Sequence, residues 1–324
     1  MTRKITSQSI LSFFSSLEWQ GKTARTFASS CGRDGSKRTE LSALAQKWCK
    51  QMKESGVDDA VLSFNYIAQK VLGDRCKPCH YGNKEMSVSA SQVHLIEEMC
   101  QRRANREPIQ YIVGDWDFRF LTLQMQAPVL IPRPETEQLV ELINNHLKSS
   151  TFAFLDVGSG SGAICLSLLS ENEKASGVAI DVSPVAVKLT RLNAHRCGMN
   201  CRLELYHCPI EYFQHPHEKK FDMIVSNPPY IPEHDMTLLQ PEVASYEDRQ
   251  ALCGGKDGMD VIRQILAAAP QLLNRNGSIW LETDLTHPPL VRDWLESRGH
   301  LGLTLHSVYK DFTNRPRFCH IVFK

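Results

Sequence analysis

The strongest constraint on the fold of this chain is the alternation of strand-like and helix-like segments that begins after Ser150. Short apolar runs predict five strands, at residues 152–157, 177–182, 201–206, 222–227 and 278–283. Amphipathic patterns predict helices at residues 162–171, 184–196, 258–273 and 287–298. This alternation predicts an α/β fold with a doubly wound, mostly parallel sheet that helices cover on both faces. Two more strands, at residues 303–309 and 317–323, predict an antiparallel edge strand.

The segments before this region predict a different organisation. Residues 39–106 have helical periodicity, so we expect a small helical domain there. Residues 107–133 are aromatic and β-branched, with Gly114-Asp115 as a turn signal, and they predict a β-hairpin connector. Pro134 then suits the first turn of a helix and is followed by acidic residues. We therefore expect the α/β domain to occupy residues 134–324.

Residues 1–38 differ in composition from the rest of the chain. They hold seven Lys or Arg, eight Ser and two acidic residues, Glu18 and Asp34. Organellar transit peptides are basic, rich in Ser and poor in acids, so this segment is predicted to be a transit peptide. A disordered tail is the alternative interpretation.

Charge and cysteine content exclude several classes of protein. A formal net charge of +1 over 324 residues does not indicate a nucleic-acid or membrane partner. No apolar run approaches the ~18 residues that a membrane span needs. Eleven Cys without a secreted framework predict reduced thiols. Cys76 and Cys79, in "CKPCH", match a haem-attachment pattern or half a zinc site, but their polar surroundings favour a loop with two incidental thiols. We expect no metal.

The segment "FLDVGSGSGAICLSLL" contains a strand, a glycine turn and a helix. Gly158, Ser159, Gly160, Ser161 and Gly162 form the turn, in which the glycines allow a ligand to approach the backbone closely. The turn lies at the end of the first strand, where doubly wound sheets bind ligands, although a purely structural turn is the alternative.

The second predicted strand ends on Asp181, where a carboxylate can accept both hydroxyls of a ribose. The alternative role of Asp181 is to cap the helix that opens at Ser183-Pro184. The glycine spacing differs from the dinucleotide pattern, and no lysine follows that could hold a triphosphate. The two features together therefore predict a nucleoside ligand, and S-adenosylmethionine fits better than NAD or ATP.

The fourth strand ends in Asn227-Pro228-Pro229-Tyr230, on the same edge of the sheet as the glycine turn. The two prolines have a fixed φ and no N–H, so they offer carbonyl acceptors without competing donors. Asn227 adds a side-chain carbonyl and Tyr230 an aromatic face. Such a corner can accept both N–H bonds of a planar NH₂ group, and acceptors that strengthen as charge develops on the nitrogen promote its methylation. A simple turn is the alternative.

"DVGSGSGAI", "AIDVSPVAVKLTRLNA" and "FDMIVSNPPYIP" resemble the class I S-adenosylmethionine-dependent methyltransferases that carry an N-P-P-Y motif. "PIQYIVGDWDF", "LIPRPETE" and "PEVASYEDRQAL…GGKDGMD" narrow the resemblance to the protein-(glutamine-N5) methyltransferases of peptide chain release factors, and specifically to their mitochondrial branch. The resemblance extends from about residue 40 to the end. It implies methyl transfer from S-adenosylmethionine to the glutamine of the Gly-Gly-Gln tip of a release factor in the mitochondrial matrix, with no direct nucleic-acid or membrane partner.

The resemblance also implies roles for individual residues. Gly158 to Gly162 would line the methionine and ribose portions of the cofactor, and Asp181 would bind the ribose hydroxyls. Asn227 to Tyr230 would hold the substrate glutamine, with the Asn227 side chain and the Pro228 carbonyl accepting from its amide. Asn227 would also adjoin the cofactor. The helical domain at residues 39–106 would bind the release factor away from the reacting atoms.

One departure from the family pattern concerns the adenine. The family commonly has an acid after the third strand, where this chain has Cys208-Pro209, and Glu211 is the candidate to replace it. Two other functions are compatible with parts of the pattern. An adenine-N6 nucleic-acid methyltransferase could use the same corner, although it needs a basic groove that a charge of +1 does not supply. A cofactor-binding protein without turnover is the other alternative.

Overall fold

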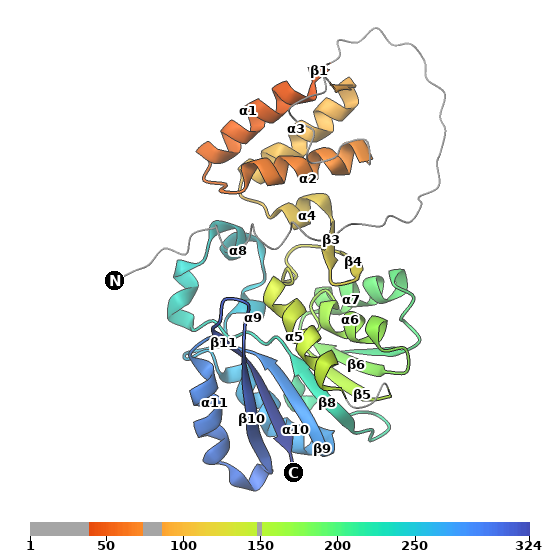
Figure 1. Ribbon diagram of the computed structural model, residues 1–324, viewed down its shortest axis with the longest axis vertical. Helices are drawn as coiled ribbons and strands as arrows, with labels where there is room; N and C mark the ends of the chain where they lie inside the picture. Colours follow the sequence, from red (N-terminus) through yellow and green to blue (C-terminus); the bar gives the residue numbers. More distant parts are fainter. Residues whose placement is uncertain (1–38, 74–85, 148–150) are drawn as a thin grey trace. The chain divides into compact units, whose positions relative to one another are not determined.

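The computed structural model describes residues 39–73, 86–147 and 151–324, and it divides into two compact units that meet in sequence at Ile109 and Gln110 (Figure 1). The predicted transit peptide and the Cys76/Cys79 pair lie outside the described residues. In the described part of the chain no helix is long and apolar enough to cross a membrane. The same residues contain no cluster of three or more potential metal ligands, and their eight cysteines are free thiols.

The first unit is a three-helix bundle, as the sequence predicts. Its helices are α1 (Leu41–Glu54), α2 (Ala60–Leu72) and α3 (Ala90–Ala104), and the short strands β1 (Thr39–Glu40) and β2 (Ser87–Val88) pair antiparallel. A buried arginine holds α3 to the start of α2: Arg103 donates to Asp59 Oδ1 at 2.9 Å and to Ser63 Oγ at 3.0 Å. These bonds offset part of the cost of burying the Arg103 guanidinium.

The connector differs from the sequence prediction in its first half. Residues Ile109–Val113 form a short helix, α4, rather than a strand. The hairpin follows it as β3 (Asp115–Phe118) and β4 (Leu121–Gln124), and its turn lies at Arg119-Phe120 instead of Gly114-Asp115. Gly114, with φ of 78°, instead ends the helix, which is a common use of glycine. Apolar runs as short as this one do not distinguish a buried helical turn from a strand.

The second unit contains a seven-stranded sheet in the order β10-β11-β9-β8-β5-β6-β7. Its strands are β5 (Ala153–Val157), β6 (Ser176–Asp181), β7 (Leu203–His207), β8 (Phe221–Ser226), β9 (Leu273–Glu282), β10 (Leu303–Lys310) and β11 (Pro316–Phe323). Strands β5 to β9 are parallel, and β11 runs antiparallel to β9 and β10, which confirms the predicted antiparallel pairing at that edge. Strand β9 begins five residues before the predicted strand, because Leu273 already pairs with Phe221.

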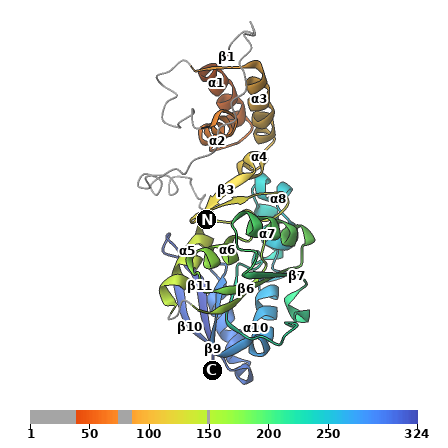
Figure 2. The same cartoon turned by 90° about the vertical axis from the view of Figure 1, so that its right-hand side faces the viewer.

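Helices cover both faces of this sheet (Figure 1, Figure 2). Because side chains alternate along a strand, Phe154 packs toward one face and Leu155 toward the other. The first face is covered by α5 (Pro134–His146), α6 (Ala163–Glu171) and α7 (Pro184–Arg196), and the second by α10 (Asp260–Leu272) and α11 (His287–Glu296). Between β8 and α10 lie three short helices: the 3₁₀ segment η5 (Glu233–Leu238), α8 (Pro241–Tyr246) and α9 (Arg249–Leu252). The 3₁₀ segments η4 (Ile210–Tyr212) and η6 (Gly299–Leu301) complete this unit.

Candidate active site

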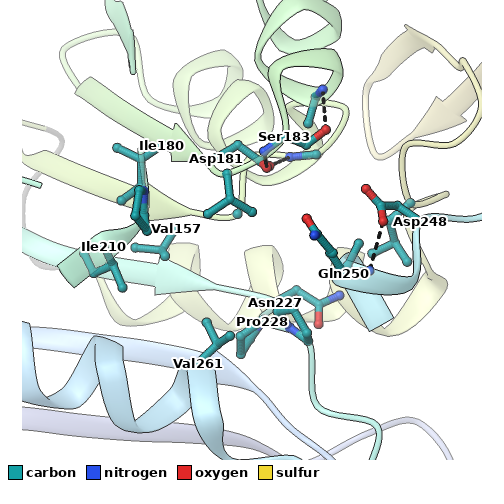
Figure 3. A pocket seen from close by; sticks show the side chains of 18 of the residues that line it. Val157, Ile180, Asp181, Ser183, Ile210, Asn227, Pro228, Asp248, Gln250 and Val261 are labelled. Carbon is teal, nitrogen blue, oxygen red and sulfur yellow. Dashed lines mark hydrogen bonds between the residues drawn. The ribbon is translucent and has the colours of Figure 1, made fainter. Parts of the chain in front are cut away.

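The predicted site residues come together at the carboxyl ends of β5, β6 and β8. The chain continues from β5 toward β6 in one direction along the sheet, and β8 lies on the other side of β5. This reversal of strand order opens a crevice where doubly wound sheets bind their ligands. In Figure 3, Asp181 and Asn227 border the same open space, with Gln250 projecting between them.

The glycine turn leaves bare backbone facing this space. Gly158, Gly160 and Gly162 have φ values of 82°, 56° and 85°, a region that L side chains rarely adopt. Gly158 and Gly160 line the pocket, and a Cβ on either would have no protein atom within 4 Å. A ligand can therefore occupy the volume that a side chain would take.

The other residues of the turn shape the loop without lining the pocket. Ser159 and Ser161 are buried, and side chains of helix α7 bind to this part of the loop. Thr190 lies 3.0 Å from Ser159 Oγ and 3.0 Å from the Gly160 carbonyl, and Asn193 donates to the Ser161 carbonyl at 2.9 Å. A Cβ on Gly162 would lie 2.9 Å from a side chain of α6, so this glycine permits close packing. The sequence did not single out Thr190 or Asn193, although both lie in "LTRLNA".

Asp181 is 9% exposed and ties the two loops of the pocket together. Its Oδ2 accepts from Gly160 N–H at 2.9 Å and its Oδ1 accepts from Ser183 N–H at 2.8 Å. Burial raises the pKa of the carboxyl, and these two backbone donors oppose that shift. Ser183, rather than Asp181, is the N-cap of α7, since its Oγ accepts from Ala186 N–H. Each oxygen of Asp181 keeps a further lone pair for a hydroxyl ligand.

Asn227 and Pro228 lie where two pockets meet. One, the glycine-loop pocket, is bordered by the glycine turn and Asp181 and also by Val129, Ile180, Cys208, Ile210, Asp248, Gln250, Val261 and Gln264. The other, the tyrosine-side pocket, is bordered by Arg133, Tyr230, Ile231, Leu239, Val243 and Leu252. Leu130 and Ala251 line both pockets, as do Asn227 and Pro228. Two molecules, one bound in each pocket, could therefore come into contact at this corner.

Side chains distant in sequence hold the corner. Asn227 Nδ2 donates to Thr136 Oγ1 at 3.1 Å, and Thr136 Oγ1 donates to Glu282 Oε2 at 2.8 Å. Tyr230 O–H donates to Glu282 Oε1 at 3.3 Å. Burial raises the pKa of Tyr230 and raises that of Glu282 to about 7. No sequence motif marks Thr136 or Glu282 as a site residue, although Glu282 ends a strand at the ligand-binding edge of the sheet.

The chain is similar in sequence to known protein families and to individual enzymes. A family model described as "PrmC N-terminal domain" matches residues 43–114, and one described as "Methyltransferase small domain" matches residues 135–242. The human "MTRF1L release factor glutamine methyltransferase" is 42% identical over 293 residues, covering 86% of this chain and 86% of that protein. The chain belongs to the release factor glutamine methyltransferase family. The "Release factor glutamine methyltransferase" of Geobacter sulfurreducens is 39% identical over 235 residues, 72% of this chain and 80% of that protein. That of Agrobacterium fabrum is 35% identical over 296 residues, 88% of this chain and 97% of that protein.

A release factor glutamine methyltransferase is a class I enzyme that uses S-adenosylmethionine, and the glycine-loop pocket fits this cofactor. The bare backbone at Gly158 and Gly160 leaves volume free for a ligand. The Asp181 carboxylate has acceptor capacity for two ribose hydroxyls. Apolar side chains, among them Ile180, Ile210 and Val261, line the rest of the pocket and suit a flat purine ring.

The pocket has no acid from the end of the third parallel strand in sequence, β7, as the sequence indicates. Cys208-Pro209 lines the pocket, whereas Glu211 borders a separate hollow beside Phe213 and Trp294. Glu211 is therefore not the replacement acid, because the 3₁₀ turn at Ile210–Tyr212 directs Ile210 into the pocket in its place. Gln264 on α10 is one of the polar side chains that do line the pocket, and no local motif marks it.

Residues 247–258 pack against the Asn-Pro-Pro-Tyr corner and against the loop that precedes α5. Buried Glu247 accepts two bonds from Arg133 Nη2, at 2.7 and 2.8 Å, and so holds the loop that precedes α5. A Cβ on Gly254 would lie 2.5 Å from the Pro229 carbonyl, and one on Gly258 would lie 2.3 Å from the Tyr230 carbonyl. These glycines are required because their backbone packs directly on the backbone of the corner.

Proposed function

We propose that this enzyme methylates the side-chain amide nitrogen (N5) of the glutamine in the Gly-Gly-Gln tip of a mitochondrial peptide chain release factor. The observation that carries the proposal is the pair of pockets sharing Asn227 and Pro228. One pocket suits S-adenosylmethionine, and the other offers a path by which a glutamine side chain could reach the same corner. The relatives' printed names support the choice of release factor and glutamine.

The corner would activate the amide through acceptors rather than through a strong base. Bound S-adenosylmethionine supplies an electrophilic methyl group on a sulfonium. The Asn227 Oδ1 and the Pro228 carbonyl would each accept one N–H of the glutamine amide and hold its nitrogen toward that methyl group. These bonds strengthen as positive charge develops on nitrogen, so they stabilise the transition state more than the bound substrate. The N–C bond forms as the S–C bond breaks and the sulfonium becomes a neutral thioether, and the positively charged nitrogen then gives one proton to water.

The tyrosine-side pocket supports a thin, extended substrate. Its lining is largely apolar and includes Leu239, Val243 and Ile231, and the half-buried Arg133 is its charged member. Two glycines before the glutamine have no side chains to collide with these walls. Leu239, which follows η5, and Val243 of α8 come from the segment after the Asn-Pro-Pro-Tyr corner.

We also propose that the three-helix unit at residues 39–106 contributes binding energy through contacts with parts of the release factor other than the tip glutamine, and that the enzyme acts in the mitochondrial matrix. The basic, Ser-rich composition of residues 1–38 supports the location. Import of the full chain, but not of a chain lacking residues 1–38, into isolated mitochondria would support it. Equal import of both would contradict it.

The direct test uses the full enzyme, S-adenosylmethionine with an isotopically labelled methyl group, and a release factor as substrate. Mass spectrometry of the digested release factor should locate one labelled methyl group on the tip glutamine. Free glutamine should be a poor substrate, because it lacks the remote contacts that orient the amide.

A release factor with its tip glutamine replaced by asparagine is the matched control. Its amide nitrogen would fall about 1.5 Å short, the length of one C–C bond, and transfer should stop. Labelling of adenine in DNA, with none on the release factor, would refute the proposed substrate in favour of a nucleic-acid methyltransferase.

A further inference from the structure

The hydrogen bonds behind Asn227 form a chain with a defined direction. An ionised Glu282 has only acceptors, so Thr136 must use its single hydroxyl proton on Glu282 Oε2, at 2.8 Å. Thr136 Oγ1 then has only lone pairs to offer, and its neighbour at 3.1 Å must be the NH₂ group of Asn227. The Asn227 amide is therefore held with its nitrogen toward Thr136, which leaves its oxygen available to the site.

We propose that Thr136 and Glu282 are positioning residues for methyl transfer: together they fix the orientation of the Asn227 amide so that its oxygen, and not its nitrogen, faces the substrate amide. The proposal rests on the acceptor role assigned to Asn227 in the proposed function. It explains why the Asn227 side chain presents its oxygen to the substrate rather than its NH₂ group, although the two ends have nearly the same size. A reversed amide would offer N–H donors to the N–H donors of the substrate.

The fold brings these residues together from three elements. Glu282 is the last residue of β9 and is 1% exposed. Strand β9 is parallel to β8, with Leu281 opposite Ser226, so Glu282 and Asn227 leave neighbouring strands at the same edge. Thr136, which is 3% exposed, lies in the first turn of α5, two residues after Pro134 at the start of the helix. Thr136 and Glu282 are buried, so water has little access to the bond between them, whereas Asn227 is half-buried where it lines the two pockets.

Other charged and titratable groups face Glu282. Arg317 on β11 favours the ionised form, and Glu135 on α5 disfavours it. Tyr230 donates to the second carboxyl oxygen, and Arg317 is itself paired with Asp311. Burial is the largest influence and raises the pKa of Glu282 to about 7. A proton on Oε2 would allow Thr136 to accept from Glu282 and to donate to Asn227, which reverses the chain.

The decisive variants remove or keep the hydrogen bonds of Thr136 while changing the shape of its side chain little. Thr136→Val is isosteric and lacks the hydroxyl, whereas Thr136→Ser keeps it. Thr136→Val should lower kcat by about 10- to 100-fold, the scale of one misdirected hydrogen bond in a transition state, with KM for the release factor and the Kd for S-adenosylmethionine unchanged. Thr136→Ser should retain most of the activity. Equal kcat values for wild type and Thr136→Val would overturn the proposal.

The pH profile gives a readout that a merely structural role would not move. In the wild type, kcat should rise with pH as Glu282 ionises, with a midpoint near 7. Glu282→Gln should lower kcat and remove this dependence. Glu171→Gln is the matched control, since Glu171 binds Arg119 and Asn144 and lines neither pocket. It should keep the wild-type profile, and a Glu282→Gln enzyme that also keeps it would overturn the proposal.

A measurement without substrate separates this inference from the proposed function. In protein carrying ¹⁵N-labelled asparagine, the side-chain NH₂ signal of Asn227 can be assigned by its loss in Asn227→Ala. That signal should shift with pH in the wild type, with a midpoint near 7, and should not shift in Glu282→Gln. If the chemical shift of this signal does not change with pH in the wild type, the inference is overturned even if release factor methylation is confirmed. A shifting signal would uphold it even if the substrate proves to be another amide.

Discussion

The two sides of the active site are built in different ways. The glycine-loop side consists of backbone and of Asp181, whose partners Gly160 and Ser183 lie 21 and 2 residues away. The Asn227 side depends on Thr136, 91 residues away, and on Glu282, which lies 146 residues from Thr136. Binding a nucleoside needs an open, polar backbone, which a short motif can supply. Directing a side-chain amide needs partners that only the assembled sheet can bring together.

Both sides also contain a buried acid, and the difference between the two acids is informative. Burial raises the pKa of Asp156, beneath the glycine loop, to about 7, as it does for Glu282. Asp156 Oδ2 accepts from the Cys165 backbone at 3.2 Å, and its Oδ1 has no hydrogen-bond partner in the described part of the chain. Glu282 instead receives two hydroxyls that lead to the substrate corner. Similar raised pKa values, about 7 for each acid, therefore accompany different connections to the reacting groups.

The largest effect should follow the loss of the amide acceptor. Asn227→Ala should lower kcat by about 10²- to 10³-fold, the usual scale for one preorganised hydrogen-bonding group in a transition state. The Kd for S-adenosylmethionine, measured by calorimetry, should change little, because the corner acts on the substrate amide. Near-normal turnover in this variant would break the division between the two sides.

Asp181→Ala should act in the opposite way. Losing the bonds from the ribose hydroxyls to a charged acceptor should weaken cofactor binding by roughly 1.5–3 kcal/mol. At saturating cofactor, kcat should be affected less than in Asn227→Ala. If titration calorimetry gives an unchanged affinity, Asp181 only ties the two loops together through its bonds to Gly160 and Ser183.

A smaller effect should separate the pocket-facing role of a glycine from its backbone role. Gly158→Ala and Gly198→Ala both place a Cβ at positive φ, with no atom within 4 Å, so each should lose about 1–2 kcal/mol of unfolding free energy. Only Gly158 lines the pocket, so only Gly158→Ala should also weaken S-adenosylmethionine binding. Equal cofactor affinity for both variants would show that the ligand does not approach this backbone.

The smallest effect on turnover is expected at Asp156. The pKa of this acid is raised from 3.8 to about 7, so the folded protein is favoured when Asp156 is protonated. Its contribution to stability is full at low pH and is lost as pH rises toward 7. Relative to wild type, Asp156→Asn should therefore gain unfolding free energy between pH 4 and 7, on the order of 1 kcal/mol or more. Denaturant titrations at several pH values would measure this gain, while the pH profile of kcat should stay like that of the wild type. A profile flattened as in Glu282→Gln would contradict the distinction between the two acids.

Much of this enzyme could be predicted from its sequence, because the relevant signals are local. The alternation of strands and helices predicted the doubly wound sheet, and the glycine turn, Asp181 and the Asn-Pro-Pro-Tyr corner were expected at one edge. Each of these depends on residues close together in the chain. Parallel strand order then brings their carboxyl ends to the same crevice.

Tertiary structure decided the rest. Local pattern could not distinguish the helix at Ile109–Val113 from a strand, since a five-residue apolar run suits either. It could not place Glu211 outside the pocket, because that depends on a single 3₁₀ turn. The direction of the Asn227 amide depends on Thr136 and Glu282, which have no sequence relation to it. A hydrogen-bond chain has a direction only when all its members are in contact, and only the packing of α5 against β8 and β9 puts them there.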